Sequence, residues 1–184
     1  MVRGRRNPLH FGLPARLKRA RANLSFNSVA AASGLSDGNT IFQLERKAGH
    51  VPRLDTVERV AYGLGLSPAF LAYGIEGDAD PPSDGLRCEG VAQRLRQTRV
   101  QRGLSVLALA TAAGLSHTAV GNGERGTIPT LATAESLAAA LGVSPGWLAY
   151  GLGPMVPPGQ RRLAASTPLS HSLELDFAEA SRTR

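Results

Sequence analysis

Three polar side chains that can hydrogen-bond to a base edge lie close together in one segment: Asn39, Thr40 and Gln43. The amides of Asn and Gln carry a donor beside an acceptor, and this pair matches the major-groove edge of adenine. Arg46 and Lys47 follow directly after these residues, and their cationic side chains can contact phosphate oxygens of the DNA backbone. The same residue types are also common on a solvated helix face, so the interpretation depends on the elements around them.

A second segment carries a related set, which is Ser116, His117, Thr118, Asn122 and Arg125. Ser36 and Ser116 stand at the start of the two segments, where a Ser side chain can cap a helix. Gly121 and Gly123 lie inside the second segment, and each costs about 1 kcal/mol relative to Ala in a helix interior. We therefore expect weaker base contacts from the second segment than from the first.

Groups for catalysis or metal binding are missing from the pattern. Cys88 is the single cysteine, and four histidines (His10, His50, His117 and His171) show no metal-ligand spacing. No nucleophile–base pair and no phosphate-cradling glycine loop is present. We expect no enzyme, no catalytic residues, no cofactor and no metal. No apolar run reaches the roughly 18 residues of a membrane span, and the N-terminus lacks an apolar signal core, so we expect a cytoplasmic protein.

The charge of the chain is concentrated near its N-terminus. The formal net charge is +7, with a sequence pI of about 10.7. Residues 1–74 hold eleven Lys or Arg against four acids, so this segment alone has a balance of +7. Arg3, Arg5 and Arg6 belong to this segment and could form a basic arm that lies along a DNA groove. A disordered basic terminus without such contacts is at least as good an interpretation. A basic chain of this kind favours a polyanionic partner.

The chain repeats itself. Residues 52–74 and 129–151 align without a gap at an offset of 77, with 13 identities. Each repeat unit is roughly 60 residues long, which suits a small domain better than one solenoid turn. Residues 75–90 between the units are rich in Asp, Pro and Gly, a composition typical of a linker.

Each unit predicts five short helices and no sheet. Ser25 and Ser36 in the first unit, and Ser105 and Ser116 in the second, are expected N-caps. Ser-Pro pairs at 67–68 and 144–145 open the last helix of each unit, because Pro is well tolerated at the first helical position. Aromatic residues are only 5% of the chain, which favours helices built on Leu and Ala.

The segments 30–36 and 110–116 each read Ala, three residues, then Gly-Leu-Ser. A small residue lets two helices cross closely, the glycine makes the turn, and the Ser starts the next helix. With LERK at 44–47, and with LGLSPAFLAYG at 64–74 and LGVSPGWLAYG at 141–151, the chain resembles the phage-repressor-like helix-turn-helix family, which includes the Cro and lambda repressor proteins. The resemblance covers about 13–74 and 91–151, and implies an all-α domain that reads DNA with its third helix, often as a dimer.

The resulting fold prediction is two tandem five-helix repressor-like domains. The expected boundaries are a basic flexible arm at 1–12, domain 1 at 13–74, an acidic Pro/Gly linker at 75–90, domain 2 with a degenerate reading helix at 91–151, and a flexible tail at 152–184.

The sequence departs from the family pattern at three places. Helix 2 of the family starts with Ser-Gln, and the Gln braces a phosphate, whereas Phe26 and Val106 occupy that position here. Gly123 replaces the apolar residue that the first unit keeps as Leu44, so we expect a missing side chain in the core below. Asp37 and Gly38 lengthen the first unit relative to the second at this point and should delay the start of its reading helix.

The favoured function is sequence-specific binding of double-stranded DNA by a transcription regulator, with repression as the expected sign. The alternatives are a protein-interaction or scaffold protein that kept the fold, and an antitoxin-like protein that binds both DNA and a toxin. Double-stranded DNA is the expected partner, and the membrane is excluded. The two units either reach adjacent half-sites through the linker or pack as an internal pseudo-dimer, and a homodimer stays possible.

Overall fold

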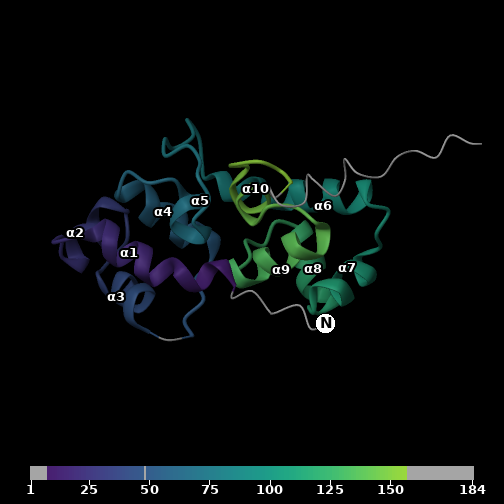
Figure 1. Cartoon of the computed structure of the whole chain (residues 1–184), viewed down its shortest axis with the longest axis horizontal. Coiled ribbons are helices and arrows are strands. Elements are labelled where there is room, and N and C mark those ends of the chain that lie inside the picture. The colour runs from purple at the N-terminus through teal and green to yellow at the C-terminus, as the bar shows by residue number, and fades with distance from the viewer. Residues whose placement is uncertain (1–7, 48, 157–184) are drawn as a thin grey trace, which may run out of the picture.

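The computed structural model describes residues 8–47 and 49–156, and every regular element in these ranges is helical. We call the elements between Leu9 and Tyr73 the N-terminal set, and those between Arg87 and Tyr150 the C-terminal set (Figure 1). The N-terminal set consists of the 3-10 turn η1 (Leu9–Gly12), α1 (Leu13–Arg21), α2 (Phe26–Ala32), α3 (Asn39–Arg46), α4 (Leu54–Gly63) and α5 (Pro68–Tyr73). The C-terminal set consists of the turn η2 (Arg87–Gly90), α6 (Val91–Gln101), α7 (Val106–Ala113), α8 (His117–Glu124), α9 (Leu131–Leu141) and α10 (Pro145–Tyr150). The all-α prediction is confirmed for these residues.

Helix starts follow the local sequence signals. The hydroxyls of Ser25, Ser105 and Ser116 accept hydrogen bonds from the backbone N–H three residues on, at 3.0 to 3.1 Å. Each bond satisfies one of the N–H groups that a helix leaves without a partner at its first turn. Pro68 and Pro145 are the first residues of α5 and α10, where a missing N–H costs nothing.

The expected cap at Ser36 is wrong. Helix α3 begins at Asn39 and its N-cap is Gly38, which makes no side-chain capping bond. Asp37 Oδ1 instead accepts from the N–H of Asn39 at 2.8 Å, and Asn27 Oδ1 on α2 accepts from the N–H of Gly38 at 3.1 Å. Asp37 forms a local Asx-type bond that competes with a helix start at Ser36. The delay expected from the Asp37–Gly38 pair is thus observed.

A tight turn joins α2 to α3 and α7 to α8 in the same way. The N–H of Leu35 donates to Ala30 O, and the N–H of Leu115 donates to Ala110 O, both at 2.9 Å. Gly34 and Gly114 have φ values of +64° and +67°, a left-handed conformation that is strained for other residues. The turn between α2 and α3 and the turn between α7 and α8 therefore have the same geometry, at equivalent positions of the two sets.

The core of the N-terminal set continues into the C-terminal set. Leu17, Ile41 and Leu54 are fully buried and belong to one apolar cluster with Leu131 and Tyr150. A second cluster lies within the C-terminal set and is built from residues such as Leu95, Leu109, Val120, Leu137 and Leu148. The shared cluster means that the two sets are packed against each other rather than separated by solvent.

Backbone bonds join the two sets in matched pairs. The N–H of Leu54 donates to Pro129 O at 3.1 Å, and the N–H of Leu131 donates to Pro52 O at 3.0 Å. Leu54 and Leu131 occupy equivalent positions in the two sequence repeats, as do Pro52 and Pro129. Each bond is therefore the counterpart of the other with the two repeats interchanged. Helices α5 and α10 also lie side by side where the sets meet (Figure 1).

Several sequence predictions concern residues at the ends. Arg3, Arg5 and Arg6 lie outside the described residues, as does most of the expected tail. Leu9–Gly12, which the sequence assigned to the arm, form η1. Among the described residues, no helix is both long enough and apolar enough to cross a membrane.

Candidate nucleic-acid interface

Helix α3 separates its buried side chains from its polar ones. Ile41 and Leu44 are buried, which orients the helix against the core. Asn39 is exposed, and Thr40 and Gln43 are half-buried. The Oε1 atom of Gln43 has no hydrogen-bond partner among the described residues. That oxygen is also buried, so pairing with a base requires a rotation of the Gln43 side chain that brings its unpartnered amide to the surface.

The C-terminal end of α3 is braced on α1 through a carboxylate. Arg21 donates to Glu45 through Nε at 2.8 Å and through Nη2 at 3.1 Å, and the side chain of Glu45 is only 3% exposed. These hydrogen bonds raise the pKa of Arg21. Because Arg21 neutralises Glu45, the exposed cations Arg46 and Lys47 dominate the local charge at this end of α3.

A pair of aromatic rings lies between α2 and α3, and one of them, Phe26, stands at the position where the expected Gln is missing. Phe26 on α2 and Phe42 on α3 meet edge to face, with ring centroids 5.8 Å apart. The guanidinium of Arg21 lies 4.6 Å from the Phe26 ring centroid. Phe26 thus holds α2 against α3 and is shielded by a cation, while Phe42 stays 42% exposed. Sequence reasoning noted the missing Gln but not this pairing, because the two rings stand on different helices and share no periodic pattern.

Helix α8 presents the second set of polar side chains. Val120 and Gly123 are its buried residues, spaced three apart like Ile41 and Leu44 on α3. His117 and Thr118 are exposed, and Asn122 is half-buried. Arg125 donates through Nη2 to Asn122 Oδ1 at 2.5 Å. Unlike Gln43, Asn122 therefore has its acceptor oriented by a neighbouring cation.

The expected gap beneath Gly123 is wrong. A Cβ atom added at Gly123 would lie 3.3 Å from Leu95 Cδ2, which is closer than ordinary van der Waals contact. The space that a larger side chain would need is therefore already occupied by Leu95 of α6. Arg99 of α6 also holds Glu124 at the end of α8, with Nε and Nη2 at 2.5 and 2.9 Å from the carboxylate oxygens. Glycine lets α8 lie close to α6, and α8 is helical from His117 to Glu124.

Gly121→Ala is expected to stabilise the protein by about 1 kcal/mol, because Ala is the better helix former. A Cβ at Gly121 would meet only the guanidinium end of Arg125, at 3.3 Å, and that end can move. Gly123→Ala is the matched control, where the same gain is opposed by contact with Leu95 in the core. Urea unfolding of both variants measures the difference. A loss of stability in Gly121→Ala would contradict a well-formed α8.

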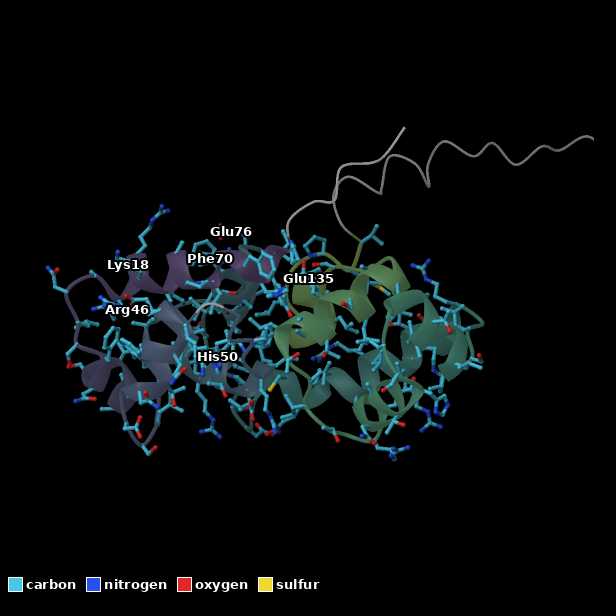
Figure 2. All side chains as sticks on the ribbon, turned by 90° about the horizontal axis from the view of Figure 1, so that it is seen from below. Lys18, Arg46, His50, Phe70, Glu76 and Glu135 are labelled. Carbon is cyan, nitrogen blue, oxygen red and sulfur yellow. The ribbon has the colours of Figure 1, made fainter. Side chains whose placement is uncertain are left out.

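Exposed cations are unevenly divided between the two sets. The exposed Lys and Arg side chains among the described residues are Lys18, Arg19, Arg46, Lys47, Arg53 and Arg59 in the N-terminal set, and Arg96, Arg102 and Arg125 in the C-terminal set. Figure 2 shows Lys18 and Arg46 on the N-terminal set, away from the boundary between the sets. The N-terminal set therefore presents the stronger positive field to a polyanion.

Two further arginines are used inside the fold. Arg16 donates to the carbonyls of Leu71 and Ala72 at the end of α5, at 2.9 and 2.6 Å. Arg94 donates in the same way to Leu148 and Ala149 at the end of α10, at 2.8 and 2.7 Å. Burial lowers the pKa of both guanidinium groups. These cations satisfy helix C-termini and do not contribute to the exposed charge.

The outer surface of the C-terminal set has an apolar character near α7. Val100 at the end of α6 is 60% exposed, and Leu107 on α7 is 64% exposed. Ala108, Thr111 and Ala112 are exposed on the same helix. The matched position to Leu107 on α2 is the polar Asn27, so the two sets differ in chemistry at the start of the helix that precedes the turn.

In the ranges 8–47 and 49–156, no three His, Cys, Asp or Glu side chains are arranged so that they could hold a metal ion. Cys88 is fully buried, and burial raises the pKa of its thiol. Among the other sequence-predicted site residues, Ser36 and Ser116 are both exposed beside their turns.

Comparison with known proteins gives independent support for a helix-turn-helix arrangement around the turn at Gly114. No curated protein and no solved structure matches the chain. A family model described as helix-turn-helix matches residues 95–148, which run from α6 to α10. This range contains the turn at Gly114 and the polar face of α8. Residues 95–148 are therefore similar in sequence to helix-turn-helix proteins.

Proposed function

We propose that the protein is a sequence-specific double-stranded DNA-binding transcription regulator in which both helical sets act as helix-turn-helix domains. The C-terminal set carries the family match. The N-terminal set supports the same assignment through its matched turn at Gly34, its matched helix order and its matched Arg–Glu brace. We propose repression as the sign of regulation, through occupation of the DNA site.

The observation that carries this proposal is the outer face of α3. Asn39 is exposed and provides an amide for a base edge, and Gln43 provides a second amide whose buried acceptor is unpartnered among the described residues and becomes available when the side chain rotates outward. Arg46 and Lys47 supply positive charge at the end of the same helix, where phosphates would run. Arg3, Arg5 and Arg6 are expected to add contacts that do not depend on sequence.

Selection of binding sites from a randomised duplex pool tests the proposal. The purified intact chain is expected to enrich one sequence family over several rounds. A random pool after selection would overturn sequence-specific DNA binding.

Gln43→Ala and Arg46→Ala are expected to behave differently. Gln43→Ala should cost about 1 to 3 kcal/mol against the preferred site and little against other sequences, because it removes a base contact. Arg46→Ala should weaken binding to all sequences alike and flatten the salt dependence by about one unit. Fluorescence anisotropy on selected and shuffled duplexes measures both effects. Identical behaviour of the two variants would contradict the placement of α3 against the bases.

A protein-interaction role is the second candidate, and the exposed Val100 and Leu107 favour it. An apolar residue at the start of α7 is a poor neighbour for a phosphate and a good one for a protein surface. Under this alternative the chain selects no DNA sequence, and replacement of Leu107 by Asn, its counterpart at Asn27, abolishes a protein complex. Under the DNA proposal, Leu107→Asn leaves the selected sequence unchanged and binding no weaker.

A further inference from the structure

The contacts between the two helical sets follow an approximate two-fold symmetry. Tyr73 donates through its hydroxyl to Leu131 O at 3.1 Å, and Tyr150 donates to Leu54 O at 3.3 Å. The two bonds exchange under the repeat relation, as the backbone bonds of Leu54 and Leu131 do. Arg53 and Thr130, which are also equivalent in the two repeats, pair directly in an antiparallel bridge. The chain thus contains an internal counterpart of a symmetric dimer interface.

Each set also holds the first turn of the other. Glu58 on α4 accepts from the N–H groups of Arg87 and Cys88 in η2, at 2.6 and 2.9 Å. Glu135 on α9 accepts from the N–H groups of Leu9 and His10 in η1, at 2.6 and 3.2 Å. Figure 2 places Glu135 where the two sets meet. The exchange is reciprocal, because Glu58 and Glu135 occupy the same position in the two repeats.

This interface is closely packed and fixes the two sets relative to each other. A Cβ atom added at Gly146 of α10 would lie 3.1 Å from the Cβ of Ala69 on α5, so these helices are in close contact. Tyr73 and Tyr150 are almost fully buried. Because the α5 and α10 faces are covered by each other, a second copy of the chain is not needed to cover them.

Helices α3 and α8 lie on a common side of this internal dimer. In Figure 1 both helices lie below the level of α5 and α10, the two helices at which the sets meet. Aligned by their buried residues, Asn39 corresponds to Thr118 and Gln43 to Asn122. The two faces therefore carry different side chains on matched helices.

We infer that one chain, as a monomer, reads a non-palindromic DNA site composed of two unlike half-sites at one fixed spacing. The inference rests on the proposed DNA binding. A homodimer presents identical reading helices and selects an inverted repeat. This chain presents α3 to one half-site and α8 to the other, and the packed interface sets the distance between them. The N-terminal set supplies the larger share of the affinity, because it holds most of the exposed cations.

Site selection with the intact chain, followed by sedimentation of the complex, provides the first test. One chain per duplex and an enriched site without inverted symmetry are expected. Insertion of about 5 base pairs, half a helical turn, between the two half-sites should reduce affinity by about 100-fold, since the second set then faces away from its half-site. Two chains on an inverted repeat, or indifference to the insertion, would overturn the inference while leaving DNA binding intact.

A second test changes one reading helix at a time and does not depend on how many chains bind each duplex. Gln43→Ala should relax base preference in one half-site only, by about 5- to 150-fold, and Asn122→Ala should do so in the other half-site only. Gln97→Ala, an exposed amide on α6, is the matched control and should change neither. Relaxation of both half-sites by Gln43→Ala, or no effect of Asn122→Ala, would overturn the inference. Failure to enrich any sequence would instead overturn the proposed function, and the inference with it.

Discussion

Between about 50 mM and about 200 mM monovalent salt, the affinity of the intact chain for its preferred duplex is expected to fall about 500-fold. The exposed cations of the N-terminal set are sufficient to neutralise about five phosphates. Each neutralised phosphate contributes about −0.9 to the slope of log K against log salt, which gives a slope near −4.5. Anisotropy titrations at four or more salt concentrations measure the slope directly.

The charge variants show which surface produces this slope. Replacement of both Arg46 and Lys47 by Ala should reduce its magnitude by about 1.8, because both residues lie at the end of α3. Arg59→Ala removes an exposed cation from α4, which Figure 1 places above α3, and should leave the slope unchanged. An equal effect of the two changes would mean that the phosphates do not run along α3.

Glu58→Ala is expected to destabilise the folded chain by about 3 to 5 kcal/mol, because the change leaves a cavity and buried donors without partners. The carboxylate is fully buried and accepts three hydrogen bonds, from the Tyr62 hydroxyl and from the N–H groups of Arg87 and Cys88. Each donor left unpaired costs about 1 to 3 kcal/mol. Urea unfolding measures the loss.

Glu135→Ala is the matched control for this prediction. Glu135 makes the equivalent bonds to the N–H groups of Leu9 and His10 and a third with His10 Nδ1 at 2.6 Å. Its side chain is 18% exposed, however, so water can replace part of what is lost. The expected loss is about 1 to 2 kcal/mol. A loss below about 1 kcal/mol for Glu58→Ala, or equal losses at the two positions, would contradict the role assigned to Glu58 in joining the two helical sets.

Local signals predicted the helices well because their causes are local. The Ser-Pro starts of α5 and α10 and the turns at Gly34 and Gly114 depend on residues within one or two helical turns. Ser36 failed for a local reason as well: Asp37 competes for the first N–H of α3, and α3 starts later.

The interactions that the sequence did not reveal join distant residues. Glu58 reaches Cys88, and Phe26 meets Phe42, through packing that no short-range pattern encodes. The repeat held an indirect signal, because Glu58 and Glu135 are identical in the alignment although both lie on otherwise apolar helix faces. A carboxylate at the same position of both repeats suggests that each binds an equivalent partner. The choice between a flexible linker and an internal pseudo-dimer required the contacts themselves.

Sequence-specific DNA binding is tested most directly by the ratio of two affinities. The intact chain is titrated, at about physiological salt, against its selected duplex and against a shuffled duplex of the same length and base composition. A preference of about 1,000-fold or more for the selected duplex is expected, as is usual for proteins that read base edges. Equal affinities for the two duplexes would contradict base reading by α3 and α8 and would reduce the protein to a nonspecific polyanion binder.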